Sequence, residues 1–154
     1  MRKSQPEKRV TSPDPKYNNP TVGKFINYLM REGKKSVART VLYDAFDIVA
    51  EKSKKDPVEI FDQAMKNTAP LMELKSRRIG GANYQVPLQV RGERRMYLAM
   101  RWIILATRGK KGLPMAQKLA EELLAASRNE GAAVKKKEDT QRMAQANRAF
   151  AHFA

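Results

Sequence analysis

Basic and aromatic side chains cluster around a Gly-Gly pair in the middle of the chain. Residues 75–84 read Lys-Ser-Arg-Arg-Ile-Gly-Gly-Ala-Asn-Tyr, and polar and apolar residues alternate after them. A two-residue turn at the Gly-Gly pair would make residues 72–90 a β-hairpin, with Arg77 opposite Tyr84. Cations beside an aromatic ring suit phosphate contact and base stacking. The candidate residues of the hairpin are Lys75, Arg77, Arg78, Gly80, Gly81 and Tyr84.

A second basic cluster follows the hairpin. Arginines recur on one face of the helix predicted there, and further basic residues gather where that helix ends. The planar guanidinium group can bind a phosphate through two parallel hydrogen bonds. This cluster therefore indicates a second phosphate-binding surface. Its residues are Arg94, Arg95, Arg101, Arg108, Lys110 and Lys111.

The positive charge is concentrated in two parts of the sequence. The 154 residues carry 31 Lys plus Arg against 16 Asp plus Glu, a net charge of +15. Residues 75–111 contain 10 basic side chains and 1 acidic one, and residues 1–36 contain 9 and 3. Residues 37–74 contain 5 and 7, so they are mildly acidic. Such an uneven excess favours a polyanionic partner, with nucleic acid as the first candidate.

The sequence lacks the residues that most enzyme sites require. It has no cysteine and a single histidine, His152, which excludes thiolate zinc sites and cysteine nucleophiles. It also lacks the glycine-rich loops that bind nucleotide phosphates. We therefore expect no enzymatic activity, no cofactor and no metal site. One alternative stays open, because Asp44 and Asp47 lie one helical turn apart and could hold magnesium in an RNA hydrolase.

Capping residues and hydrophobic periodicity predict about six helices. Asn19 and Asp56 each precede a proline that suits the first turn of a helix. Ser36 is predicted to cap the second helix. The predicted helices run from Pro20 to near Gly33, from Ser36 to near Ser53, from Pro57 to near Pro70, from near Glu93 to Gly109, from Pro114 to near Gly131, and over residues 132–152.

The same periodicity predicts which faces are buried. The second helix is expected to bury Val37, Val41, Ala45, Ile48 and Val49. The fourth is expected to bury Met96, Tyr97, Met100, Ile103, Ile104 and Thr107. The sixth has only a thin apolar stripe, so it is expected to lie at the periphery.

The fold class that follows is mainly α. We expect one domain over residues 1–154, a bundle of about six helices with a protruding two-stranded β-hairpin. Residues 1–18 contain three prolines and five basic residues and have almost nothing to bury. They are predicted to form a disordered basic arm.

A second reading of the basic charge is a DNA-binding or nucleoid protein. The helix ending at Gly109, the turn after it and the next helix have the order of a helix-turn-helix. The match is weak, because Glu121 and Glu122 on the second helix would repel phosphates. We keep this as the alternative function.

Three blocks of the sequence are similar to one known family. Residues 75–87, Lys-Ser-Arg-Arg-Ile-Gly-Gly-Ala-Asn-Tyr-Gln-Val-Pro, strongly resemble the signature of bacterial-type small-subunit ribosomal protein seven. Residues 12–17, Ser-Pro-Asp-Pro-Lys-Tyr, resemble the N-terminal arm of that family, and residues 137–152 resemble its C-terminal helix. The likeness spans nearly the whole chain.

The resemblance implies a primary binder of the 3′ major domain of small-subunit ribosomal RNA that nucleates assembly of the subunit head. It implies that the hairpin and the C-terminal helix lie near exit-site transfer RNA and messenger RNA, and that small-subunit ribosomal proteins nine and eleven are neighbours. We accordingly expect a ribosomal, cytoplasmic location. No membrane is expected, since there is no apolar run of about 18 residues and residues 1–15 lack the apolar stretch of a signal peptide.

Charge and resemblance together predict the residues of each surface. Contact with ribosomal RNA is predicted for Arg2, Lys3, Lys8, Arg9, Lys16, Lys34, Lys35, Arg94, Arg95, Arg101, Arg108, Lys110, Lys111 and Met115. The exit-site side is predicted to include the hairpin residues together with Lys135, Lys136, Arg142 and Arg148.

Overall fold

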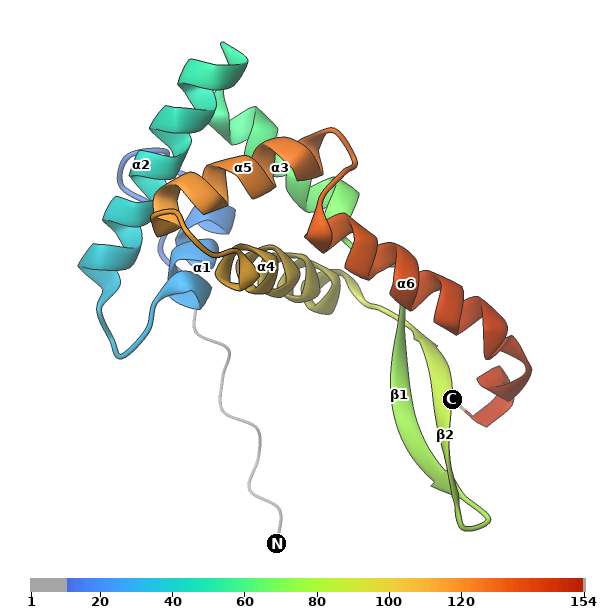
Figure 1. Cartoon of the computed structure of the whole chain (residues 1–154). Coiled ribbons are helices and arrows are strands. Elements are labelled where there is room, and N and C mark those ends of the chain that lie inside the picture. The colour runs from blue at the N-terminus through green and yellow to red at the C-terminus, as the bar shows by residue number, and fades with distance from the viewer. Residues whose placement is uncertain (1–10, 154) are drawn as a thin grey trace, which may run out of the picture.

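The computed structural model describes residues 11–153 and confirms the mainly α fold with a two-stranded hairpin (Figure 1). Helices α1 to α5 form the bundle, the hairpin extends away from it, and α6 lies alongside the base of the hairpin. The elements are α1 (Pro20–Leu29), α2 (Lys35–Ser53), α3 (Pro57–Thr68), β1 (Met72–Ile79), β2 (Ala82–Gln89), α4 (Gly92–Gly109), α5 (Met115–Ser127), α6 (Ala132–Ala146) and the 3-10 helix η1 (Arg148–Phe153).

Local capping chemistry fixes where α1 and α3 begin. The Asn19 side chain accepts a hydrogen bond from the backbone N–H of Thr21 at 2.8 Å, and Asp56 accepts one from Val58 at 2.9 Å. Both starts are as predicted. The predicted Ser36 cap is wrong, because α2 begins at Lys35, one residue earlier. Glu32 and Gly33 both adopt positive φ, so the connecting turn is complete before Ser36 is reached.

The core lies where α2, α3 and α5 pack together, with α1 and α4 closing its sides. Three phenylalanines meet there: the Phe25 and Phe61 ring centroids are 5.3 Å apart, and those of Phe46 and Phe61 are 5.7 Å apart. Leu119 and Leu123 of α5 are fully buried beside them. This helix therefore holds the bundle together and leaves its neighbours' outer faces for solvent or partners.

Two predicted core positions are wrong. Val37 is 57% exposed, because α2 turns Ala38, Leu42 and Phe46 toward the core, and this neighbouring stripe has larger side chains to bury. Met96 is 37% exposed, because it lies in the first turns of α4 beside a hollow rather than under another helix. The predicted burial of Met100, Ile103, Ile104 and Thr107 is confirmed.

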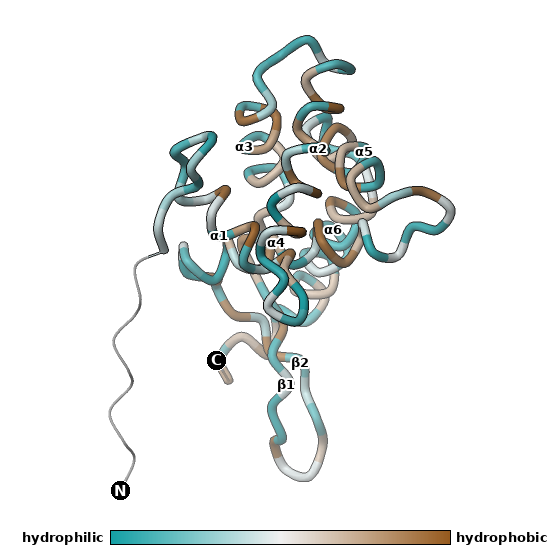
Figure 2. The backbone as a smooth tube through the Cα atoms, turned by 90° about the vertical axis from the view of Figure 1, so that its left-hand side faces the viewer, coloured by the Kyte–Doolittle hydropathy of each residue, from teal (hydrophilic) through white to brown (hydrophobic). Residues whose placement is uncertain are grey.

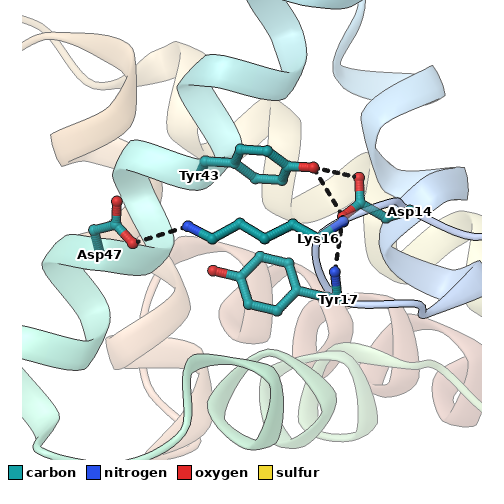
Figure 3. Close-up of polar contacts among 5 residues, drawn as sticks. All are labelled: Asp14, Lys16, Tyr17, Tyr43 and Asp47. Atoms are coloured by element: carbon teal, nitrogen blue, oxygen red, sulfur yellow. Dashed lines mark hydrogen bonds and ion pairs between the residues drawn. The ribbon is translucent and has the colours of Figure 1, made fainter.

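The disordered arm predicted for residues 1–18 is wrong for its described part. Asp14 is buried and accepts hydrogen bonds from the backbone N–H groups of Lys16 (3.0 Å) and Tyr17 (3.2 Å). The Tyr43 hydroxyl donates to the same carboxylate at 2.9 Å (Figure 3). Tyr17 packs edge-on against Phe46 with centroids 5.2 Å apart. Residues 11–18 are thus anchored on α1 and α2, and residues 1–10 lie outside the described residues.

This anchoring explains the glycine at position 23. A Cβ atom on Gly23 would lie 2.7 Å from the backbone oxygen of Ser12, a distance that normal packing does not allow. Glycine is therefore required for the segment before Asp14 to cross α1 this closely.

Candidate nucleic-acid interface

The hairpin has the predicted register and turn. Arg77 pairs with Tyr84, and Ile79 pairs with Ala82. Gly80 and Gly81 both have positive φ, +55° and +89°, as a two-residue hairpin turn of the I′ type requires. Figure 2 shows the hairpin projecting below the bundle with mostly hydrophilic colouring. Lys75, Arg77 and Arg78 are exposed on it, so the outer half of the hairpin presents three cations to solvent.

Tyr84 has a different environment from the one expected of a free stacking ring. It is half-buried, and its centroid lies 5.0 Å from that of Phe150 in η1. Tyr84 therefore fastens the hairpin to the end of the chain. Phe150 was missed as a functional neighbour, because the sequence gives no sign that the chain folds back after α6.

The C-terminal segment departs from the single helix predicted over residues 132–152. The α-helix ends at Ala146, and Arg148–Phe153 form η1, which packs against β2. The break lets the chain turn back so that Phe150 reaches Tyr84. The exposed basic residues of this segment are Lys135, Lys136, Arg142 and Arg148.

A groove of about 850 Å³ runs between α4, α6 and the hairpin, and we call it the hairpin groove. Its walls combine apolar and basic side chains, with Trp102 half-buried among them. The groove brings together three of the predicted residues, two from α4 and one from α6. These are Arg94, Arg101 and Lys136.

Both arginines of the hairpin groove are oriented by neighbours. The Arg94 Nε lies 3.1 Å from the Glu73 carboxylate of β1, and its guanidinium lies 5.1 Å from the Tyr97 ring centroid. Arg101 donates a hydrogen bond to the Tyr97 hydroxyl at 2.9 Å. These contacts leave both guanidinium groups exposed but hold them in place. Arginine presented in this way is suited to bind phosphate.

A second group of predicted residues meets where α1, α2, α4 and α5 come together. This basic corner surrounds a hollow of about 300 Å³ and includes Lys34, Arg108 and Met115. Arg108 donates to the backbone oxygen of Leu29 at 3.1 Å. Burial, and then the nearby Arg31, lowers the pKa of the Arg108 guanidinium. Such crowding of positive charge is relieved when a phosphate binds.

Arg31 belongs to the basic corner but was not among the predicted residues. It lines the same hollow as Lys34 and Arg108. The sequence did contain a sign of its role, because three of the five residues in the run Arg31-Glu32-Gly33-Lys34-Lys35 are basic. Lys35 and Lys111 are both exposed near this end of the bundle.

Two predicted contact residues are engaged within the protein, and a third, Arg95, has a buried Nε that no hydrogen-bond partner meets. Lys110 lies 2.9 Å from the buried carboxylate of Glu122. Lys16 lies between the rings of Tyr17 and Tyr43 and 3.4 Å from Asp47 (Figure 3). Arg95 is half-buried. Their part in nucleic-acid binding stays a prediction, as does that of Arg2, Lys3, Lys8 and Arg9, which lie outside the described residues.

The structure offers little to the alternative of a metal-dependent hydrolase. Over residues 11–153, no three histidine or acidic side chains converge as a metal site would need. Asp47 faces Lys16, and Asp44 is exposed. Within the same range, none of the helices combines the length and the hydropathy that a membrane crossing demands.

Comparison with known proteins identifies the family of this chain. The chain is 56% identical over 153 residues to small ribosomal subunit protein uS7 of Thermotoga maritima, covering 99% of both chains. It is 53% identical over 152 residues to the uS7 protein of Xanthobacter autotrophicus, covering 99% of this chain and 97% of the relative. The family model described as ribosomal protein S7p/S5e matches residues 1–148. The chain therefore belongs to the ribosomal protein S7p/S5e family.

Proposed function

We propose that this protein is a structural constituent of the small ribosomal subunit and binds its ribosomal RNA. Membership of the S7p/S5e family supports the ribosomal role. The observation that carries RNA binding is the basic corner, where Arg31 and Lys34 of the α1–α2 turn and Arg108 of α4 come together around one hollow. A surface of this kind neutralises several neighbouring phosphates at once.

The proposed target is the 3′ major domain of the small-subunit RNA, whose binding would nucleate assembly of the subunit head. Folded RNA presents phosphates and unpaired bases, while its major groove is too deep and narrow for side chains to read. The basic corner and the hairpin groove are two separate hollows and suit separate segments of one folded RNA. We assign the corner to ribosomal RNA and the hairpin side to the exit site.

On the exit-site side, the proposed partners are transfer RNA and messenger RNA. The exposed cations of β1 and α6, together with Arg148 of η1, support this assignment. Contact between Tyr84 and Phe150 would keep the hairpin and η1 in one orientation as they approach RNA. Small-subunit ribosomal proteins nine and eleven are the proposed protein neighbours, in the cytoplasm.

DNA binding is the competing function, and the packing of α5 argues against it. A recognition helix must expose its N-terminal half to a major groove. Leu119, Ala120 and Leu123 of α5 are instead fully buried in the core. Over Met115–Ala120 only Gln117 is exposed, because α5 packs against α2, α3 and α4, so the helix presents few side chains to a groove.

Competition binding tests the proposed function. The labelled probe is a 3′ major domain RNA fragment, and the competitors are an unrelated structured RNA and a random DNA duplex, at salt concentrations between about 50 and 200 mM. We expect the cognate fragment to remain preferred at the higher salt. Equal competition by all three polyanions would contradict a site-specific ribosomal-RNA binder.

A further inference from the structure

An open hollow between α1 and α4 is used by none of the surfaces described so far. It has a volume of about 640 Å³, within the roughly 300–1,000 Å³ range of small-ligand sites. Two large side chains are exposed at it, Tyr28 of α1 (44%) and Met96 of α4 (37%). Figure 1 shows the two helices side by side. An aromatic ring and a thioether that are exposed side by side form an apolar patch, and such a patch indicates a binding site.

The Tyr28 ring is held in a fixed orientation. Its centroid lies 5.3 Å from that of Tyr97, and the two planes meet at 68°, an edge-to-face contact. Tyr97 is itself held by the hydrogen bond from Arg101 and by the Arg94 guanidinium near its ring. The Tyr97 ring therefore forms one wall of the hollow and is already covered by its neighbours. The Tyr28 ring remains available for stacking.

The charge around the hollow favours an anionic occupant with an aromatic part. Lys24 of α1 is exposed on its rim, and the two arginines beside Tyr97 lie behind one wall. Asn27, which lines the hollow from α1, has an amide that can both donate and accept hydrogen bonds. Lys24 and Glu93 are the charged residues of the lining, so the excess of positive charge comes from Arg94 and Arg101 behind Tyr97. A nucleotide matches each of these groups. Its base can stack on the Tyr28 ring, the edge of the base can form hydrogen bonds with the Asn27 amide, and its phosphate can contact the cations.

We propose that this hollow is a binding site for one unpaired nucleobase of RNA, stacked on Tyr28. The site rests on the proposed RNA-binding function and gives it a specificity element. A base inside a duplex has both faces covered by its neighbours, so only a base turned out of a helix can enter. The hollow would thus let the protein distinguish a folded RNA with an extruded base from any fully paired segment of equal charge.

Substitutions at Tyr28 test the site because they leave the net charge unchanged. Tyr28→Leu keeps an apolar side chain and removes the ring, while Tyr28→Phe keeps the ring. Leu71→Ala is the control, since Leu71 is also exposed (53%) but lies at the base of the hairpin. Each variant is titrated with the 3′ major domain RNA fragment and with a fully paired RNA duplex of the same length, after its melting temperature is compared with that of the unaltered protein.

For the folded fragment, we expect Tyr28→Leu to weaken binding about 5- to 140-fold, the range for loss of one stacked base. Tyr28→Phe and Leu71→Ala should bind within about twofold of the unaltered protein, and duplex affinity should be the same for all four. Equal binding by Tyr28→Leu and Tyr28→Phe would overturn the stacking site and leave RNA binding intact. Equal losses on fragment and duplex would also overturn it. A lowered melting temperature of Tyr28→Leu with unchanged RNA affinity would mean that the protein itself, or a peptide partner, fills the hollow.

If the unaltered protein fails to prefer the folded fragment over the duplex, the proposed function fails before the hollow is tested. In that case Lys24→Gln gives the separate readout. It should still weaken the binding of single-stranded oligonucleotides if the hollow accepts nucleotides, and no change would overturn the site as well.

Discussion

Lys110 and Glu122 form an ion pair across the turn between α4 and α5, with Nζ 2.9 Å from a carboxylate that is 1% exposed. The same carboxylate accepts a hydrogen bond from the backbone N–H of Ala133 in the first turn of α6, also at 2.9 Å. One buried side chain thus joins the end of α4 to the start of α6. Since α6 forms one wall of the hairpin groove, Glu122 sets the position of an element that we propose faces RNA.

Replacing Glu122 should destabilise the protein. Glu122→Ala removes a charge-assisted hydrogen bond and an ion pair, and we expect the free energy of unfolding to fall by about 2–3 kcal/mol. Glu121→Ala is the matched control, because Glu121 is only half-buried and lies 3.8 Å from the same lysine. It should change stability by about 0.5 kcal/mol or less. Urea unfolding measures both, and equal effects would contradict the assigned role of Glu122.

The hairpin turn should not tolerate side chains that resist positive φ. Gly80→Val and Gly81→Val each place a β-branched residue in the left-handed region, at a cost of about 1–2 kcal/mol. Because the hairpin lies outside the core, we expect local distortion, seen as amide chemical-shift changes around Ile79 and Ala82, with little change in melting temperature. Gly92→Ala is the control, since a Cβ there meets no atom within 4 Å. Unchanged shifts in the valine variants would refute the two-glycine turn.

Asp14 should stabilise the free protein although it precedes the first helix. Asp14→Asn keeps the size of the side chain but replaces one acceptor oxygen of a buried carboxylate with a donor, so we expect a loss of about 1–3 kcal/mol. Asp44→Asn, on the exposed face of α2, is the control and should stay within about 0.5 kcal/mol. Thermal unfolding compares them. Identical melting temperatures would mean that residues 11–18 are not anchored in solution.

Tyr43 should be among the last tyrosines to ionise as pH rises. Burial raises the pKa of its hydroxyl, and the hydrogen bond to Asp14 raises it further, from an ordinary value of 10.0. The folded protein therefore keeps a proton that the unfolded chain loses. The stability that this hydroxyl contributes is complete below pH 10 and is lost as pH rises through the folded-state pKa. Tyrosinate absorbance measures this, and the step at highest pH should be missing in Tyr43→Phe. An unchanged titration curve would contradict the prediction.

Features decided by a few neighbouring residues could be predicted from the sequence. Asn19 and Asp56 act within one helical turn, and the Gly-Gly pair needs only its own backbone freedom, so the helix starts and the hairpin register were correct. Within the predicted α2 stripe only Val37 was wrong, because two sets of residues share helical spacing and packing against α3 and α5 decides between Val37 and Ala38.

Long-range contacts could not be predicted in this way. The buried Asp14 depends on a tyrosine 29 residues away, and the Tyr84 ring on a phenylalanine that reaches it through a break after α6. Charge counting predicted RNA contact for Lys34, Arg108 and Lys110 alike. A count of charge carries no information on which lysine has a buried carboxylate beside it. Segment charge thus predicted the kind of partner, while the contacts that each cation makes within the protein required the structure.

The salt dependence of affinity tests most directly whether the basic corner binds phosphates of ribosomal RNA. Arg31→Gln/Lys34→Gln/Lys35→Gln removes three exposed charges at the corner. Lys52→Gln/Lys54→Gln/Lys55→Gln removes three exposed charges at the far end of α2, so the two variants have the same net charge.

The measurement is the slope of log affinity against log salt for the 3′ major domain fragment. We predict that the corner variant loses about 2 to 3 units of that slope, at about 0.7–0.9 per phosphate contact, while the control keeps the slope of the unaltered protein. Equal slopes for the two variants would mean that only overall charge matters, and would contradict the account.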